Sequence, residues 1–415
     1  MTVRDVGKGW DSMFKELLAK EPVNTSRQRE IDLIKAFTIL TMVVCHCIEE
    51  LYKSYQGDLI ADIIIGYENQ LVGAQAFMIG MGIGIVYSRN SNPKTLARRG
   101  ASLLIVGQVL NLTRFVLPNL LGYALTGDVF YRKAVFLVFS SDIMQFAGLT
   151  FLLLALLRHL KLSEMKIFLI SIVMNIVGTM LVFKVNTGSY ILDQFFAFFV
   201  ATSAESYFPL FHWFIFPAFG MAFGTILKRV KDKKKFYTTL LIPTGIYTVF
   251  YIYVASCIDQ PFFLVLHELE AFNRMNITDA LSQLVCNTFL IGICFFITGI
   301  LSDGINKGIS FISGNINRFY CVQWVLVGWV EFVLRLIGYE VTQGFVCYSI
   351  AIVLILLTWT IVSIYANRLA KQCAEFIGKR RPLLYGLVVA ASVVTCAWAY
   401  GAGLPMPNMS NDYLK

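Results

Sequence analysis

The sequence predicts an all-α membrane protein, a polytopic bundle of about eleven transmembrane helices with its N-terminus in the cytoplasm and its C-terminus outside. Of the 415 residues, 57% are hydrophobic and only 15% are charged, and the mean hydropathy is +0.66. Such values are typical of a chain that lies largely in lipid, and they exclude a soluble globular domain. The net charge of +9 is therefore not interpreted as a nucleic-acid signal, and no nucleic-acid partner is expected.

Each predicted span is an apolar run of about 20 residues, the length of helix that crosses a ~30 Å hydrocarbon core. Most of the 35 Lys and Arg fall on the segments that an N-in topology places in the cytoplasm, and this asymmetry predicts the orientation. The predicted spans lie near residues 32–52, 69–87, 99–119, 142–160, 165–184, 208–228, 236–256, 281–301, 319–338, 343–366 and 383–402.

The chain divides into one long domain with two short tails. Residues 1–30 are predicted to be a cytoplasmic tail, either an amphipathic helix on the membrane surface or a partly disordered segment. Residues 31–403 form the transmembrane domain, and residues 404–415 form a short extracytoplasmic tail. Longer outer connections are predicted at 120–141, 185–207 and 257–280, the second with an interfacial or re-entrant run.

The composition also bounds the partners and cofactors. The nine cysteines are scattered and form no metal-ligand or disulfide pattern, so no metal is expected. Membrane lipids are the expected surroundings, in the plasma membrane if the chain is bacterial, and a homodimer is left open.

The first span carries an ionisable side chain deep in its apolar run. At 1.5 Å per residue, His46 lies about 21 Å beyond Asp32, past the middle of the bilayer core. An ionisable group there is costly and is a functional hypothesis by default. Glu49 and Glu50 share its helical face, and a carboxylate can orient an imidazole that acts as a general base. Alternatively, His46 only hydrogen-bonds a neighbouring helix.

The second span and the loop that follows it suggest a way for a ligand to enter. Gly80 and Gly84 form a small-xxx-small pair, which favours close helix packing and would also leave room for a thin acyl chain. The loop from Arg89 to Arg99 is basic and can bind phosphates, or can simply reflect the positive-inside bias.

Further polar groups fall on the same outer side as His46. Asn111 and Arg114 lie towards the outer end of the third span, and Asp142 and Gln145 open the fourth. An Arg114–Asp142 ion pair is predicted, as a site component or as a link between two helices. His212 opens the sixth span between two prolines that can kink it.

The ninth span has polar residues at both ends. Glu331 and Arg335, four residues apart, are predicted to pair within the membrane. Tyr320, Gln323 and Trp324 are placed near its cytoplasmic end.

Several of these motifs resemble the transmembrane acyltransferase superfamily. The first span is similar to its opening motif through Arg29, Ile31-Asp32, Lys35 and His46. Phe208–Trp213 with Gly220–Gly224, and Ser141–Gln145, are similar to the heparan-alpha-glucosaminide N-acetyltransferase-like group. The second span with the arginines after it resembles both that group and the acyltransferase-3 family. The pattern departs from the family at Lys35, where an arginine is usual, and at His212, where the glucosaminide group commonly has proline.

The resemblance implies acyl transfer from cytosolic acyl-CoA, usually acetyl-CoA, to a hydroxyl or amine of a sugar or glycolipid beyond the membrane. It implies His46 as the catalytic base, and Asp142 as a group that orients His46 or the acceptor. Glu49 and His212 complete the candidate catalytic set. The candidate substrate-binding residues are Arg114, Asn111 and Gln145, and the candidate CoA-binding residues are Arg89, Arg98, Arg99, Arg29 and Asp32.

Two other functions are compatible with the residues alone. A multipass transporter or flippase would use the same buried charges as a substrate path, although the inverted repeats typical of such proteins are not evident. A membrane sensor or scaffold would need the charges only to hold its helices together.

Overall fold

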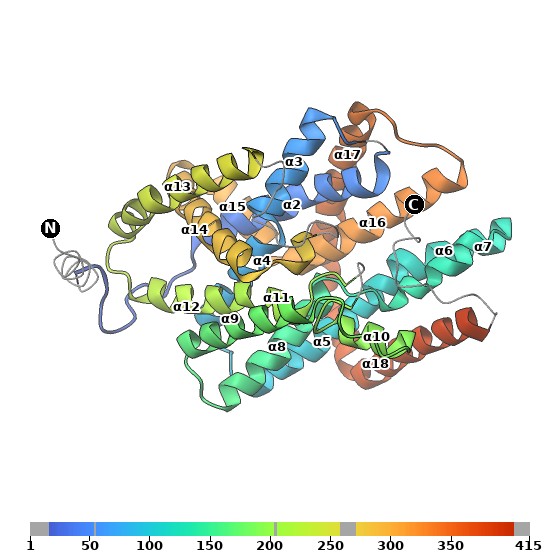
Figure 1. The fold of residues 1–415 in the computed structure, drawn as a ribbon, viewed down its shortest axis with the longest axis horizontal. Coiled ribbons are helices and arrows are strands. Elements are labelled where there is room, and N and C mark those ends of the chain that lie inside the picture. The colour runs from blue at the N-terminus through green and yellow to red at the C-terminus, as the bar shows by residue number, and fades with distance from the viewer. Residues whose placement is uncertain (1–15, 54, 203–205, 258–270, 402–415) are drawn as a thin grey trace.

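The computed structural model describes residues 16–53, 55–202, 206–257 and 271–401, and every regular element within them is a helix (Figure 1). The predicted all-α class is therefore confirmed. The elements are α2 (Arg29–Leu51), α3 (Leu59–Gln70), α4 (Gly73–Tyr87), α5 (Pro93–Asn111), the π-helix η1 (Leu112–Val116), α6 (Leu117–Thr126), α7 (Val129–Ala134), the 3₁₀-helix η2 (Val135–Phe139), α8 (Ile143–His159), α9 (Glu164–Leu181), α10 (Tyr190–Ala197), α11 (Leu210–Trp213), α12 (Ile215–Arg229), α13 (Lys233–Cys257), the 3₁₀-helix η3 (Ala271–Arg274), α14 (Ile277–Ile300), α15 (Asp303–Gly314), α16 (Ile316–Leu336), α17 (Gly344–Ile364), the π-helix η4 (Tyr365–Leu369) and α18 (Ala370–Gly401).

Ten helical stretches among the described residues are long and apolar enough to cross a membrane. The last, Gly344–Ala399, is 56 residues long and overlaps most of both final predicted spans. The chain is thus an integral multipass membrane protein, while its orientation stays a prediction.

Several predicted connections are helical. The region after the first span contains α3, and the predicted outer connection 120–141 contains most of α6 together with α7 and η2. A helix satisfies its own backbone hydrogen bonds, so it is the form a chain takes at membrane depth, where no water is available. The predicted interfacial run contains the eight-residue α10. The proposed amphipathic helix of the first tail falls largely in residues 1–15, and these and the tail 404–415 lie outside the described residues.

α2 runs through the bundle and packs against α3, α4, α14, α15, α16 and α17 (Figure 1). Its buried face includes Ile34, Ile39 and Ile48, each at most 2% exposed. A helix surrounded in this way can hold a side chain at bilayer depth without contact with lipid.

Glycines set the contact between α4 and α12. A Cβ on Gly82 would overlap the backbone of α12, and one on Gly220 would overlap the backbone of α4. The predicted pair behaves differently, because the Lys35 stem covers Gly80 and Gly84 faces open space. Close packing therefore uses the opposite face of α4 from the one predicted.

Candidate functional site

His46 lies in the last third of α2 and is held by two side chains of α16. Its Nδ1 is 3.1 Å from Gln323 Oε1, and its ring stacks on Trp324 with a centroid distance of 3.6 Å and an interplanar angle of 23°. The imidazole is partly exposed, whereas Gln323 is fully buried. An amide oxygen that accepts from Nδ1–H leaves Nε2 with a free lone pair, the form that a general base requires.

The two glutamates next to His46 do not hold its ring. Glu50 binds the Arg114 guanidinium, with 2.8 Å between Oε1 and Nη2, and Glu49 is exposed. The amide of Gln323 takes the place expected for a carboxylate. The reason is geometric: the nearest partner of the ring comes from another helix and not from the next turn of α2.

Arg114 lies in a widened turn. The ring of Pro118 would clash with the carbonyl four residues earlier, which is that of Arg114, and the chain responds with the π-helix η1, closed by a hydrogen bond from Leu117 N–H to the Leu112 carbonyl. Gly328 of α16 allows close approach, since a Cβ there would come within 2.9 Å of the Arg114 side chain.

The Arg114 guanidinium meets two carboxylates and one aromatic ring. It pairs with Glu50 and also with Asp142, at 3.8 Å, so the predicted Arg114–Asp142 pair is present. Its Cζ lies 3.2 Å from the centroid of Trp324, the same indole that stacks on His46. With 9% of its side chain exposed, Arg114 is a nearly desolvated cation compensated on two sides.

Asp142 sits at the start of α8 and accepts from the Ile143 N–H at 2.5 Å, while the Tyr320 hydroxyl donates to the same carboxylate. No hydrogen bond joins it to His46 within the described chain, so of the two roles expected for Asp142 only that of orienting the acceptor stays a prediction. Asp142 is the N-cap of α8, as expected for a residue that opens this span, and the short helices α7 and η2 precede it. Which side of the membrane this end of α8 faces stays a prediction.

The other two predicted substrate-binding residues, Asn111 and Gln145, contact neighbouring segments of the protein. Asn111 donates its amide to the carbonyls of Val138 and Ser140, and so fixes the segment that leads to Asp142. Gln145 is 2% exposed and lies against Gly107, where a Cβ would meet its amide carbon at 2.6 Å. Neither amide oxygen has a hydrogen-bond partner among the described residues.

His212 belongs to a different part of the bundle. It is fully buried in α11, packs against Gly178 of α9, and its carbonyl accepts from Asn175. Its ring nitrogens have no hydrogen-bond partner among the described residues. The structure therefore does not bring His212 into the network of His46.

The predicted CoA-binding residues fall into two groups. Arg89, Arg98 and Arg99 are exposed around the start of α5. Arg29 lines a cavity of about 410 Å³ at the N-terminal end of α2, while Asp32 is bound by Arg27 at 2.5 Å and by Ser313 at 2.7 Å. The lining of this cavity does not include His46.

Three site residues were not recognised as partners of His46 and Asp142. The sequence analysis places Tyr320, Gln323 and Trp324 near the cytoplasmic end of their span and assigns them no partner. Their spacing puts them on one side of a helix, which is the available signal. Which helix this side packs against depends on contacts between residues far apart in the sequence, and the spacing of residues does not reveal such contacts.

A family model described as the catalytic region of heparan-alpha-glucosaminide N-acetyltransferase matches residues 27–254, more than half of the chain. The matched region contains His46, Arg114 and Asp142, whereas α16 lies outside it. No curated protein and no solved structure matches the chain significantly.

Proposed function

The chain belongs to the heparan-alpha-glucosaminide N-acetyltransferase family, and on that premise we propose that it moves an acetyl group from cytosolic acetyl-CoA to a hydroxyl or amine of an extracytoplasmic sugar or glycolipid. Membership supports a membrane acetyltransferase. The donor, the base and the acceptor are parts of the proposal, and each is argued from the residues around His46.

In this proposal His46 is the general base. Its Nε2 takes the proton of the acceptor O–H or N–H as the acceptor atom attacks the thioester carbonyl carbon. The carbon–sulfur bond then breaks, and the departing thiolate takes the proton from His46 to give free CoA. The atoms and protons of the transfer therefore balance without any reactant besides acetyl-CoA and the acceptor.

The remaining groups position the base and hold the site. Gln323 fixes the tautomer of His46 through Nδ1, and Trp324 fixes the plane of its ring. Arg114, held by Glu50 and Asp142, is a cation next to the indole, where it favours the negative charge that develops on the thioester oxygen. Asn111 supports this arrangement through the backbone before Asp142.

One observation carries the proposal most directly. His46 is partly exposed while its Nδ1 is engaged by a fully buried amide, so the other ring nitrogen is free to meet a substrate. A histidine that only joined two helices would be expected to be enclosed on all sides.

The test measures transfer of labelled acetyl from acetyl-CoA to glucosamine-containing acceptors by purified protein. We expect His46→Ala to lower kcat by about 10²–10⁴-fold, the usual contribution of a general base. His159→Ala is the matched control, because this histidine is exposed at the end of α8. Transfer that persists unchanged in His46→Ala would remove His46 from the mechanism.

A further inference from the structure

The N-terminal end of α2 forms a cleft with a segment that we call the N-terminal strap, residues 16–28. The strap is fixed to the connection between α12 and α13: Ala19 N–H donates to the Arg229 carbonyl at 2.7 Å, and Lys231 N–H donates to the Leu17 carbonyl at 3.0 Å. These bonds place the strap beside the first turns of α2 and α13.

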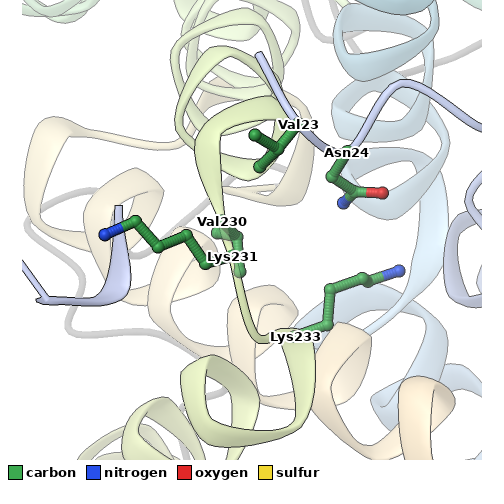
Figure 2. Close-up of a pocket in the computed structure, with 5 residues that line it drawn as sticks. All are labelled: Val23, Asn24, Val230, Lys231 and Lys233. Atoms are coloured by element: carbon green, nitrogen blue, oxygen red, sulfur yellow. The ribbon is translucent and has the colours of Figure 1, made fainter. Parts of the chain in front are cut away.

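Two cavities open at this cleft and share one residue, Lys233. The first, of about 420 Å³, lies between the strap and the α12–α13 connection, and Figure 2 shows Asn24 above the Lys233 side chain with Lys231 on the other side. The second, of about 410 Å³, is lined by a mixture of cations and apolar side chains. Its lining consists of Arg27, Arg29, Glu30, Lys233, Lys234, Phe295, Phe296, Thr298 and Gly299.

The cations of the second cavity outnumber its anions. Glu30 is 1% exposed and is bound by Lys233 at 2.6 Å and by the Tyr237 hydroxyl at 3.0 Å. Arg27 pairs with Asp32. These two pairs leave the charges of Arg29 and Lys234, both exposed to the cavity mouth, without a carboxylate in the lining.

The N-terminus of α13 already has protein anions near it. Asp232, just before the helix, accepts a hydrogen bond from the Lys235 N–H at 3.0 Å, and Lys235 pairs with Glu16 at 2.5 Å. Of the three lysines that open α13, Lys234 alone has no ion pair among the described residues, and a helix N-terminus favours a further anion beside it. A positive-inside bias requires basic residues in this connection but does not require a cavity between them.

We propose that this cleft is a phosphate-binding site, with Arg29 and Lys234 as its principal contacts. Phe295 and Phe296 form an apolar wall of the same cavity, so the ligand combines phosphate with an apolar or aromatic part. Two sources have that chemistry, the nucleotide end of CoA and the headgroup of an anionic lipid. If the phosphate is that of CoA, the assignment rests on the proposed function, and the cleft takes the place of the exposed side chains of Arg98 and Arg99 in α5 as the donor's anchor.

The experiment compares two double variants in lipid nanodiscs, Arg29→Glu/Lys234→Glu and the control Lys161→Glu/Lys166→Glu, which reverses two exposed cations outside both cavities. CoA binding is measured by calorimetry, and retention of phosphatidylglycerol against phosphatidylcholine by native mass spectrometry. We expect the cleft variant to weaken one of these ligands at least about tenfold, since a hydrogen bond to a charged group is worth about that factor or more. The control is expected to leave it unchanged.

The outcomes separate the sources. Weaker CoA binding assigns the cleft to the donor, and loss of phosphatidylglycerol alone assigns it to a lipid headgroup. Unchanged binding of both ligands, or an equal effect of the control variant, overturns the proposal. Arg29→Gln/Lys234→Gln, with its melting temperature, shows whether an effect comes from misfolding. CoA that binds to wild type without any acetyl transfer would contradict the proposed function and leave the cleft standing.

Discussion

The two ends of α2 both carry charged side chains, yet these charges are satisfied in different ways. At the His46 end, Arg114 has two carboxylates and Asp142 has a cation, a tyrosine and a backbone N–H. At the other end, the cations of the cleft exceed its anions. A network whose positive and negative side chains pair with each other keeps its geometry when no substrate is bound, as acid–base chemistry requires. A cavity whose cations exceed its anions instead attracts a negatively charged ligand.

The largest expected effect comes from breaking the compensated network. Arg114→Ala would leave Asp142 and Glu50 without their shared cation, and breaking a buried pair costs about 3–5 kcal/mol of unfolding free energy. Thermal unfolding in detergent measures this. Lys53→Ala is the control, because its pair with Glu340 is exposed, with 62% and 58% of the two side chains accessible, and is worth about 0.5 kcal/mol. Equal melting shifts in the two variants would show that the Arg114 network is not specially compensated.

A smaller effect is expected from the amide that holds the imidazole. Gln323→Leu removes the acceptor of His46 Nδ1–H, and we expect kcat to fall about tenfold with the KM for acetyl-CoA unchanged, the worth of one hydrogen bond. Gln323→Glu keeps an acceptor oxygen and is expected to restore much of the rate. Gln283→Leu changes another fully buried glutamine, on α14, and controls for loss of stability. A similar fall in kcat in both leucine variants would contradict a positioning role.

The smallest effect is expected away from both ends, at the turn between α2 and α3. The Ala61 N–H, together with the hydroxyls of Tyr52 and Tyr348, lowers the pKa of Asp58 below its ordinary value. The unfolded chain therefore binds this proton more readily, so the stabilisation is full above the ordinary pKa and is lost as pH falls through the lowered one. Wild type should lose more melting temperature than Asp58→Asn between about pH 5 and pH 2.

Asparagine also caps helices well, so the capping bond itself is kept in this variant. Parallel pH curves for the two proteins would mean that Asp58 has no such role. A difference between the two pH curves gives the contribution of Asp58 to acid unfolding, and this contribution is subtracted when acid effects at either end of α2 are measured.

The fold class and part of the site could be predicted because they depend on local pattern. Apolar runs, the distribution of Lys and Arg, and His46 in the first span are read along the chain. The predicted pairs Arg114–Asp142 and Glu331–Arg335 are both present. The prediction that a carboxylate of the first span orients the His46 ring was wrong, because side chains on the same face of α2 compete with side chains of other helices for contact with that ring.

The sequence by itself determined that the chain is a bundle of membrane-spanning helices, that its first span holds a histidine, and which cations cluster beside apolar runs. Only the tertiary structure decided that Gln323 and Trp324 hold this histidine, that His212 lies elsewhere, and that Arg29 lines one cavity with the start of α13. The physical reason is that helix periodicity depends on residues close together in the sequence, whereas the choice of which two helix faces pack against each other depends on side-chain packing over the whole bundle.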